Sequence, residues 1–314
     1  MAGLPQGSRR HHSFVRINPY FENDFFASQD RYYTVGWKIA TVFSNTQRDV
    51  TQNSLSAIDS AKSCYLSLSI GQQVYTPTDQ QAVELVQDDR PYAGWLYVAS
   101  AWHKLNENTK RSMQVQIGIV GPSAGGEQLM NLFHALIHND PVRGWHNQLA
   151  DEIGVLAGYE KKWRFRTTNL PIHMQGDLIP HAGVALGNVH TFANAGAQLL
   201  MGWNVPGDFG VSRIRPSAES GLETYSTETH SDWKFYVYLG LDARFVIRNI
   251  FLDGNTFKAS HSVAKSPVVA FFSAGWVVRY RRFQFMYSHI ATTKEFKTQN
   301  DMHQYASLVF SWLF

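Results

Sequence analysis

The chain of 314 residues has little cysteine and little charge. Cys64 is its single cysteine, which excludes an intrachain disulfide and any metal site made of several thiolates. Charged residues make up 17%, below the value of about a quarter that is usual in soluble domains. The net charge is only +3, and the basic residues are scattered, so nothing indicates a nucleic-acid partner.

Long apolar runs are also missing. No stretch reaches the ~18 apolar residues of a membrane-spanning helix, and the longest run, near 268–278, is broken by Ser273 and Gly275. Residues 1–12 are polar and basic, without the apolar core of a secretion signal. We therefore expect 1–12 to be a disordered or vestigial N-terminus, with the native start truncated or replaced, and 13–314 to form one domain.

Aromatic residues and alternation are what the chain has in abundance. Aromatic residues reach 14%, yet the mean hydropathy is −0.26. This combination is typical of strands that face lipid on one side and water on the other. The segment 233–246 is the clearest example: Phe235, Leu239 and Phe245 share one face, while Asp242 and Arg244 share the other. The second face is too charged for a dry core but suits a watery lumen.

Twelve segments follow this period of two. They are approximately 13–21, 32–44, 63–75, 93–106, 111–121, 150–166, 173–187, 193–203, 233–247, 268–280, 281–293 and 303–314. An even number suits a closed antiparallel barrel. The sequence thus predicts an all-β fold, a transmembrane antiparallel β-barrel of about 12 strands in a bacterial outer membrane. A soluble β-sandwich is the alternative.

The last strand ends on Phe314. A C-terminal strand that closes with an aromatic residue resembles the signal by which bacterial barrel-assembly machinery recognises its clients. We therefore expect that machinery and outer-membrane lipids to be partners of the chain.

One segment has a helical period instead. From about Glu127, apolar residues recur at helical spacing, and Asn139-Asp140-Pro141 ends the pattern. The apolar stripe is Leu129, Leu132, Phe133 and Leu136. His134 lies on the opposite face. These positions predict a short amphipathic helix in an extracellular loop at the membrane surface, with its polar face lining a site against the barrel wall.

Four motifs in order resemble those of a known family. They are Asn23-Asp24, the segment 30–36 (DRYYTVG), the segment 89–95 (DRPYAGW), and 121–126 (GPSAGG) leading to His134. Together they resemble the lipid A 3′-O-deacylase (LpxR-like) family over about residues 14 to 165. The resemblance implies a twelve-stranded outer-membrane barrel that acts on the lipid A of lipopolysaccharide. The implied reaction is calcium-dependent hydrolysis of the ester of the 3′-linked acyloxyacyl chain.

The resemblance also implies site residues. The functional positions of the family match Asn23, Asp24, Thr34 and His134, and Asp140 is the nearest counterpart of an acidic residue after the helix. A histidine titrates near neutral pH and suits a general base, here His134. Asp24 and Asp140 offer the oxygen ligands that Ca²⁺ prefers. Asn23 and Thr34 are then the expected hydrogen-bond partners of the oxyanion or the attacking water.

The basic residues that bind the substrate are expected outside the loop 76–88. Residues 76–88 contain no Lys or Arg, although the anionic groups of lipid A favour basic partners. Arg90 and Lys38 are therefore the predicted substrate-binding residues.

Two other functions remain open at this level. One is an outer-membrane phospholipase with a Ser–His pair, for which Ser123 is the serine nearest His134 in sequence. The other is a non-enzymatic barrel, either a porin or a structural protein.

Overall fold

The computed structural model describes residues 13–44, 63–168, 170–223 and 232–314, and every structural statement below refers to these residues. The predicted N-terminal segment 1–12 lies outside them. The strands are β1 Ser13–Asn23, β2 Tyr32–Ser44, β3 Ser63–Thr76, β4 Ala93–Leu105, β5 Thr109–Val120, β6 Glu152–Trp163, β7 Phe165–Thr167, β8 Gln175–Gly187, β9 His190–Trp203, β10 Trp233–Asn249, β11 Val268–Tyr280, β12 Phe283–Thr292 and β13 His303–Leu313. The helices are α1 Gly126–Leu136 and α2 Ile250–Asp253, with short 3-10 turns η1 Phe25–Ala27, η3 Pro122–Ala124, η4 Trp145–Asn147 and η5 Pro171–His173.

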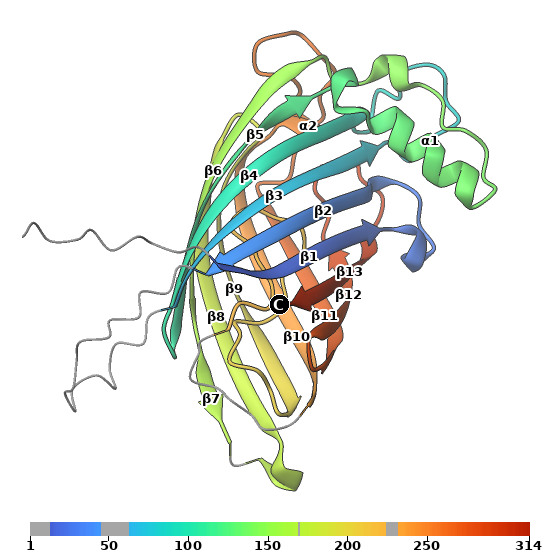
Figure 1. Ribbon diagram of the computed structural model, residues 1–314. Helices are drawn as coiled ribbons and strands as arrows, with labels where there is room; N and C mark the ends of the chain where they lie inside the picture. The colour runs from blue at the N-terminus through green and yellow to red at the C-terminus, as the bar shows by residue number, and fades with distance from the viewer. Residues whose placement is uncertain (1–12, 45–62, 169, 224–231) are drawn as a thin grey trace, which may run out of the picture.

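The sheet closes on itself. Sequential strands pair antiparallel, β1 pairs with β13, and β6 pairs with β8, which leaves a closed barrel of twelve strands with the short β7 as an extra strand on β8. The predicted all-β barrel is therefore confirmed (Figure 1). The predicted strand 150–166 is interrupted at Arg164, whose side chain turns to the backbone carbonyls of Glu107 and Asp208.

The strands alternate as their sequences predict. On β10, Leu239 and Phe245 are exposed on the outer surface, while Tyr236 and Asp242 are buried inside the barrel. Exposed apolar side chains on the wall of a membrane barrel face lipid, so this alternation defines the band that sits in the bilayer. Separately, the described part of the chain has no helix of sufficient length and apolar character to cross a membrane.

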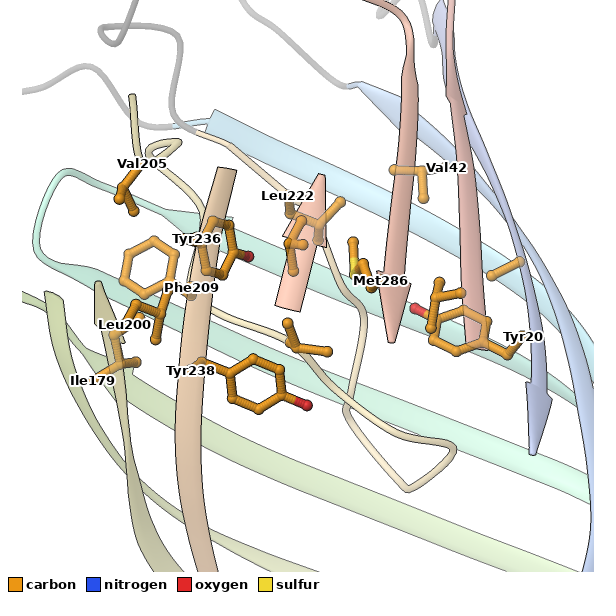
Figure 2. Packing of buried hydrophobic residues seen from close by; sticks show 14 of the residues in the cluster. Tyr20, Val42, Ile179, Leu200, Val205, Phe209, Leu222, Tyr236, Tyr238 and Met286 are labelled. Carbon is orange, nitrogen blue, oxygen red and sulfur yellow. The ribbon is translucent and has the colours of Figure 1, made fainter. Parts of the chain in front are cut away.

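A segment between β9 and β10 fills part of the lumen. Residues 204–223 fold back into the barrel, where Val205, Phe209 and Leu222 pack against inward-facing side chains such as Tyr20 and Tyr236 (Figure 2). We call residues 204–223 the plug. Its apolar cluster packs against residues such as Tyr20 of β1, Ile179 of β8 and Tyr236 of β10, so this part of the interior is filled by side chains.

One buried carboxylate holds the plug to the wall. Glu219 accepts hydrogen bonds from Asn18 Nδ2 and Tyr20 Oη, both at 2.7 Å, and its Oε2 lies 3.3 Å from Lys38 Nζ. All of these side chains are buried. The plug is thus fixed by polar contacts that replace the water a channel would hold.

Glu219→Ala is expected to release the plug. The substitution leaves Lys38 buried without its partner, and breaking a buried ion pair in this way costs about 3–5 kcal/mol. We expect residues 204–223 to become accessible to protease and the barrel to conduct ions in planar bilayers. Glu107→Ala, at an exposed glutamate on the β4–β5 turn, is the control. A Glu219→Ala barrel as closed and as protease-resistant as the parent would contradict this role.

Candidate active site

Helix α1 lies against the outside of the barrel. On β4, the Trp95 side chain points into the lumen, where it packs with residues such as Tyr97. Successive side chains of a strand alternate, so the neighbouring Gly94 faces outward. Gly94 meets the start of α1 so closely that a Cβ on Gly126 would lie 3.1 Å from the Cα of Gly94. Further along the helix, Met130 packs on Val35 of β2 and Val74 of β3. The predicted helix is therefore confirmed, and it projects beside the rim where β1 and β3 end (Figure 1).

The β1–β2 turn brings Asn23 and Asp24 to this rim. Asn23 Oδ1 accepts a hydrogen bond from the backbone N–H of Phe25 at 2.7 Å, which leaves its buried Nδ2 without a partner. Asp24 Oδ2 accepts from the N–H of Arg31 at 2.7 Å, and its buried Oδ1 has no partner. Burial raises the pKa of the Asp24 carboxyl well above its usual range, and the nearby carboxylate of Asp30 adds to the rise.

Thr34 joins this turn to β3 and the loop after it. Its hydroxyl lies 2.7 Å from the hydroxyl of Thr76, and Gln80 Nε2 donates to that same Thr76 oxygen at 3.2 Å. Gln80 Nε2 also lies 2.6 Å from the carbonyl of Asp30 and 2.7 Å from its Oδ1. The buried Gln80 Oε1 makes no hydrogen bond. With the backbone hydrogen bond from the Asp24 N–H to the Thr34 carbonyl at 3.2 Å, the network ties Asp24, Thr34 and Asp30 into one polar cluster.

His134 completes the cluster from the helix side. Its ring is buried, with Nδ1 2.6 Å from the backbone carbonyl of Asp140. A carbonyl oxygen only accepts, so Nδ1 is the nitrogen that carries the proton, and in the neutral ring Nε2 has a free lone pair. Nε2 lies 3.2 Å from Asp30 Oδ2, although the two atoms are not aligned as a hydrogen bond. The structure thus presents Nε2 as a proton acceptor beside a carboxylate.

The four predicted catalytic residues are therefore brought together, and three partners are added. Asp30, Thr76 and Gln80 were not predicted as site residues. Asp30 opens the motif 30–36, which was the available signal. Gln80 lies in the loop 76–88, outside all four motifs, so the sequence carries no signal for it.

Three other predicted residues take different places. Lys38 is inside the barrel on Glu219, and Arg90 is fully buried with Nη1 3.1 Å from Glu295 Oε2. Both residues thus form ion pairs with acidic residues outside the cluster, and their role in substrate binding stays a prediction. The side chain of Asp140 is exposed, and the residue meets the site through its backbone carbonyl on His134.

A cavity inside the barrel is separate from this cluster. Tyr33, Arg213 and Arg244 are among its lining residues, but none of Asn23, Asp24, Thr34 and His134 reaches it. The predicted catalytic residues thus gather outside the lumen, on the lipid side of the wall.

The cluster has hard oxygen atoms that suit a calcium ion. No group of three or more His, Cys, Asp and Glu side chains arranged to hold a metal occurs among the described residues, so carboxylates alone do not make the site. Asp24 Oδ1 and Gln80 Oε1 are, however, buried oxygens without partners, close to the carboxylate of Asp30. A buried carboxylate without an ion pair favours a cation, and mixed carboxylate and amide oxygens are ligands that Ca²⁺ accepts.

Comparison with known proteins agrees with this architecture. The family model described as "Outer membrane protein LpxR" matches residues 5–314. The chain belongs to the LpxR family. It is accordingly a bacterial outer-membrane protein, as predicted. No curated protein sequence matches the chain.

Among solved structures, LpxR from Salmonella typhimurium superimposes with a TM-score of 0.73 at 22% identity, covering 95% of this chain and all of that one. At that identity the likeness establishes the shared LpxR-like barrel. Lower similarity is found to the β-domain of the Bordetella autotransporter BrkA, with a TM-score of 0.48 and 9% identity over 96% of this chain and 100% of that one.

Ser123 is not placed to act with His134. Its Oγ donates to Asp151 Oδ2 at 2.7 Å and its N–H to Asp151 Oδ1 at 2.8 Å, in an exposed turn before α1. We expect Ser123→Ala to keep any hydrolytic activity of the parent within about twofold, since an exposed hydrogen bond of this kind contributes little to the structure. Labelling by a fluorophosphonate probe that disappears in Ser123→Ala, together with activity, would restore the serine hydrolase alternative.

Proposed function

We propose that this protein hydrolyses the ester of the 3′-linked acyloxyacyl chain of lipid A. The observation that carries the proposal is the position of His134 Nε2, which makes no hydrogen bond, lies 3.2 Å from Asp30 Oδ2, and is buried with Asp24 and Thr34 on the outer side of the barrel wall. A lipid ester reaches such a site from the membrane without entering the lumen. The LpxR family membership supports lipid A as the substrate, and the rim with α1 is then the extracellular one.

His134 acts as the general base in this proposal. Nε2 takes a proton from water as the water oxygen adds to the ester carbonyl carbon. The Asp30 carboxylate, 3.2 Å from Nε2, stabilises the imidazolium that forms. The imidazolium then returns the proton to the departing sugar oxygen. The products are the free acyloxyacyl acid and a 3′-hydroxyl on the sugar.

The tetrahedral intermediate needs hydrogen-bond donors. Asn23 Nδ2 is a buried donor without a partner, and it belongs to the same turn as Asp24. The Thr34 hydroxyl is a second possible donor at the cluster. An unused buried donor costs free energy in the resting protein and is available to a developing oxyanion.

Calcium belongs to the proposal as a cofactor. Asp24, Asp30 and Gln80 Oε1 are the groups that would hold it, in place of the carboxylate pair Asp24 and Asp140 expected from sequence. When bound, the ion supplies a Lewis acid that polarises the ester carbonyl.

The direct test uses purified protein in detergent with lipid A. We expect mass spectrometry to detect the free acyloxyacyl acid in the presence of Ca²⁺ and to lose that signal with a calcium chelator. Folding is verified by the heat-dependent gel mobility of an intact barrel. Folded protein that releases no acid from lipid A at any calcium concentration would contradict the proposal.

A further inference from the structure

Four phenylalanines join the two segments that carry the candidate site. Phe21 at the end of β1 and Phe133 of α1 have ring centroids 6.3 Å apart, and Phe25 of η1 lies 6.2 Å from the same Phe133 ring. Phe26 lies 6.3 Å from Phe21 and 6.2 Å from Phe25. We call Phe21, Phe25, Phe26 and Phe133 the phenylalanine platform.

The platform is not a closed core. Phe25 and Phe26 are 49% and 47% exposed, and the adjoining helix face continues with Leu132 at 60% and Leu136 at 69%. These rings and leucines leave apolar area uncovered beside the candidate site. A surface of this kind marks a site for an apolar partner or for lipid.

The platform is adjacent in sequence to the predicted catalytic residues. Phe25 directly follows Asp24, and Phe133 directly precedes His134. Phe21 pairs with Trp37 on β2, and the next outward residue of that strand, Ile39, is exposed on the lipid-facing wall. The platform thus adjoins both the polar cluster and the exposed apolar wall.

We propose that the phenylalanine platform binds the acyl chain next to the scissile ester and makes the enzyme selective for long-chain esters. This inference rests on the proposed function and names the substrate feature that the site reads. Each methylene of a chain that moves from water onto an apolar surface gains about fourfold in binding. Because the rings come from both the β1–β2 turn and α1, an acyl chain bound on them would also align its ester carbonyl with Nε2 of His134.

The test compares two ester lengths in a double variant. We expect the parent to prefer a p-nitrophenyl ester of a twelve-carbon acid over the butyrate ester. In Phe25→Ala/Phe26→Ala we expect the ratio of kcat/KM for the two esters to fall at least about tenfold, because hydrolysis of the twelve-carbon ester loses more than hydrolysis of the butyrate ester. Phe272→Ala removes an equally exposed ring from β11, away from the site, and is the matched control.

Two outcomes would overturn the platform. An unchanged ratio would mean that the rings make bulk membrane contact only, and an equal loss for both esters would mean a structural role. A non-hydrolysable twelve-carbon ether gives a readout independent of catalysis. If the parent hydrolyses neither ester but binds this ether more tightly than the double variant does, the deacylase proposal fails while the platform stands. Equal binding of the ether by both proteins contradicts the platform.

Discussion

His134→Ala is expected to lower the release of acyloxyacyl acid from lipid A by about 100- to 10,000-fold, the usual contribution of a general base. The residue presents Nε2 to the cluster because Nδ1 is fixed on the Asp140 carbonyl. His146→Ala is the matched control, since His146 is an exposed histidine of the same loop. The measurement is the initial rate with purified, heat-modifiable protein in detergent.

The variant also separates base catalysis from folding. His134 belongs to helix α1 and is not part of the twelve-stranded wall, so the barrel should insert normally without it. A folded His134→Ala protein with more than a tenth of the parent rate would mean that another group takes the proton.

Asp24→Asn is expected to raise the calcium concentration for half-maximal activity at least tenfold, roughly the penalty for disturbing a metal site. The change keeps the shape and the hydrogen bond from the Arg31 N–H but removes the buried charge. A buried carboxylate without an ion pair is itself costly, so resistance to urea in chelator should not fall.

Asp140→Asn is the control for this prediction. Its side chain is exposed, and its backbone carbonyl on His134 is unaffected by the substitution. The two variants are compared in calcium titrations of the lipid A assay. A larger effect at Asp140 than at Asp24 would restore the ligand pair expected from sequence.

The barrel wall was predictable because the alternation within each strand indicates which of its side chains face lipid and which face the lumen. Alternation in 233–247 requires only neighbouring residues, and the same holds for the helix at Gly126–Leu136. The plug was not predictable. Residues 204–223 show neither the strand period of two nor the helical period. Their apolar residues pack on apolar side chains of the lumen, such as Tyr20, that are far away in sequence.

The site shows the same division. The clustering of Asn23, Asp24, Thr34 and His134 was predictable because all four belong to the motifs that resemble the family, while their catalytic role stays a prediction. The positions of Arg90 and Lys38 were not predictable, because a sequence does not indicate which acidic residue a cation will pair with. Glu295 is 205 residues from Arg90, and Glu219 is 181 residues from Lys38. The pairs form only when the barrel closes.

The exposed leucines of α1 add a further lesson. An amphipathic helix in a soluble protein buries its apolar stripe, but here Met130 and His134 face the wall while Leu132 and Leu136 are exposed. At a membrane surface the apolar residues of a helix can face lipid instead of the protein. This agrees with the interfacial helix predicted from the sequence.

Tandem mass spectrometry of lipid A from a Gram-negative host tests the central claim most directly. The host would express the chain behind a secretion signal, with His134→Ala in parallel. We predict the loss of one acyloxyacyl unit, located by fragmentation at the 3′ position of the distal sugar, in the parent and not in the variant. Unchanged lipid A in cells with correctly inserted parent protein, or the same loss with His134→Ala, would contradict the account.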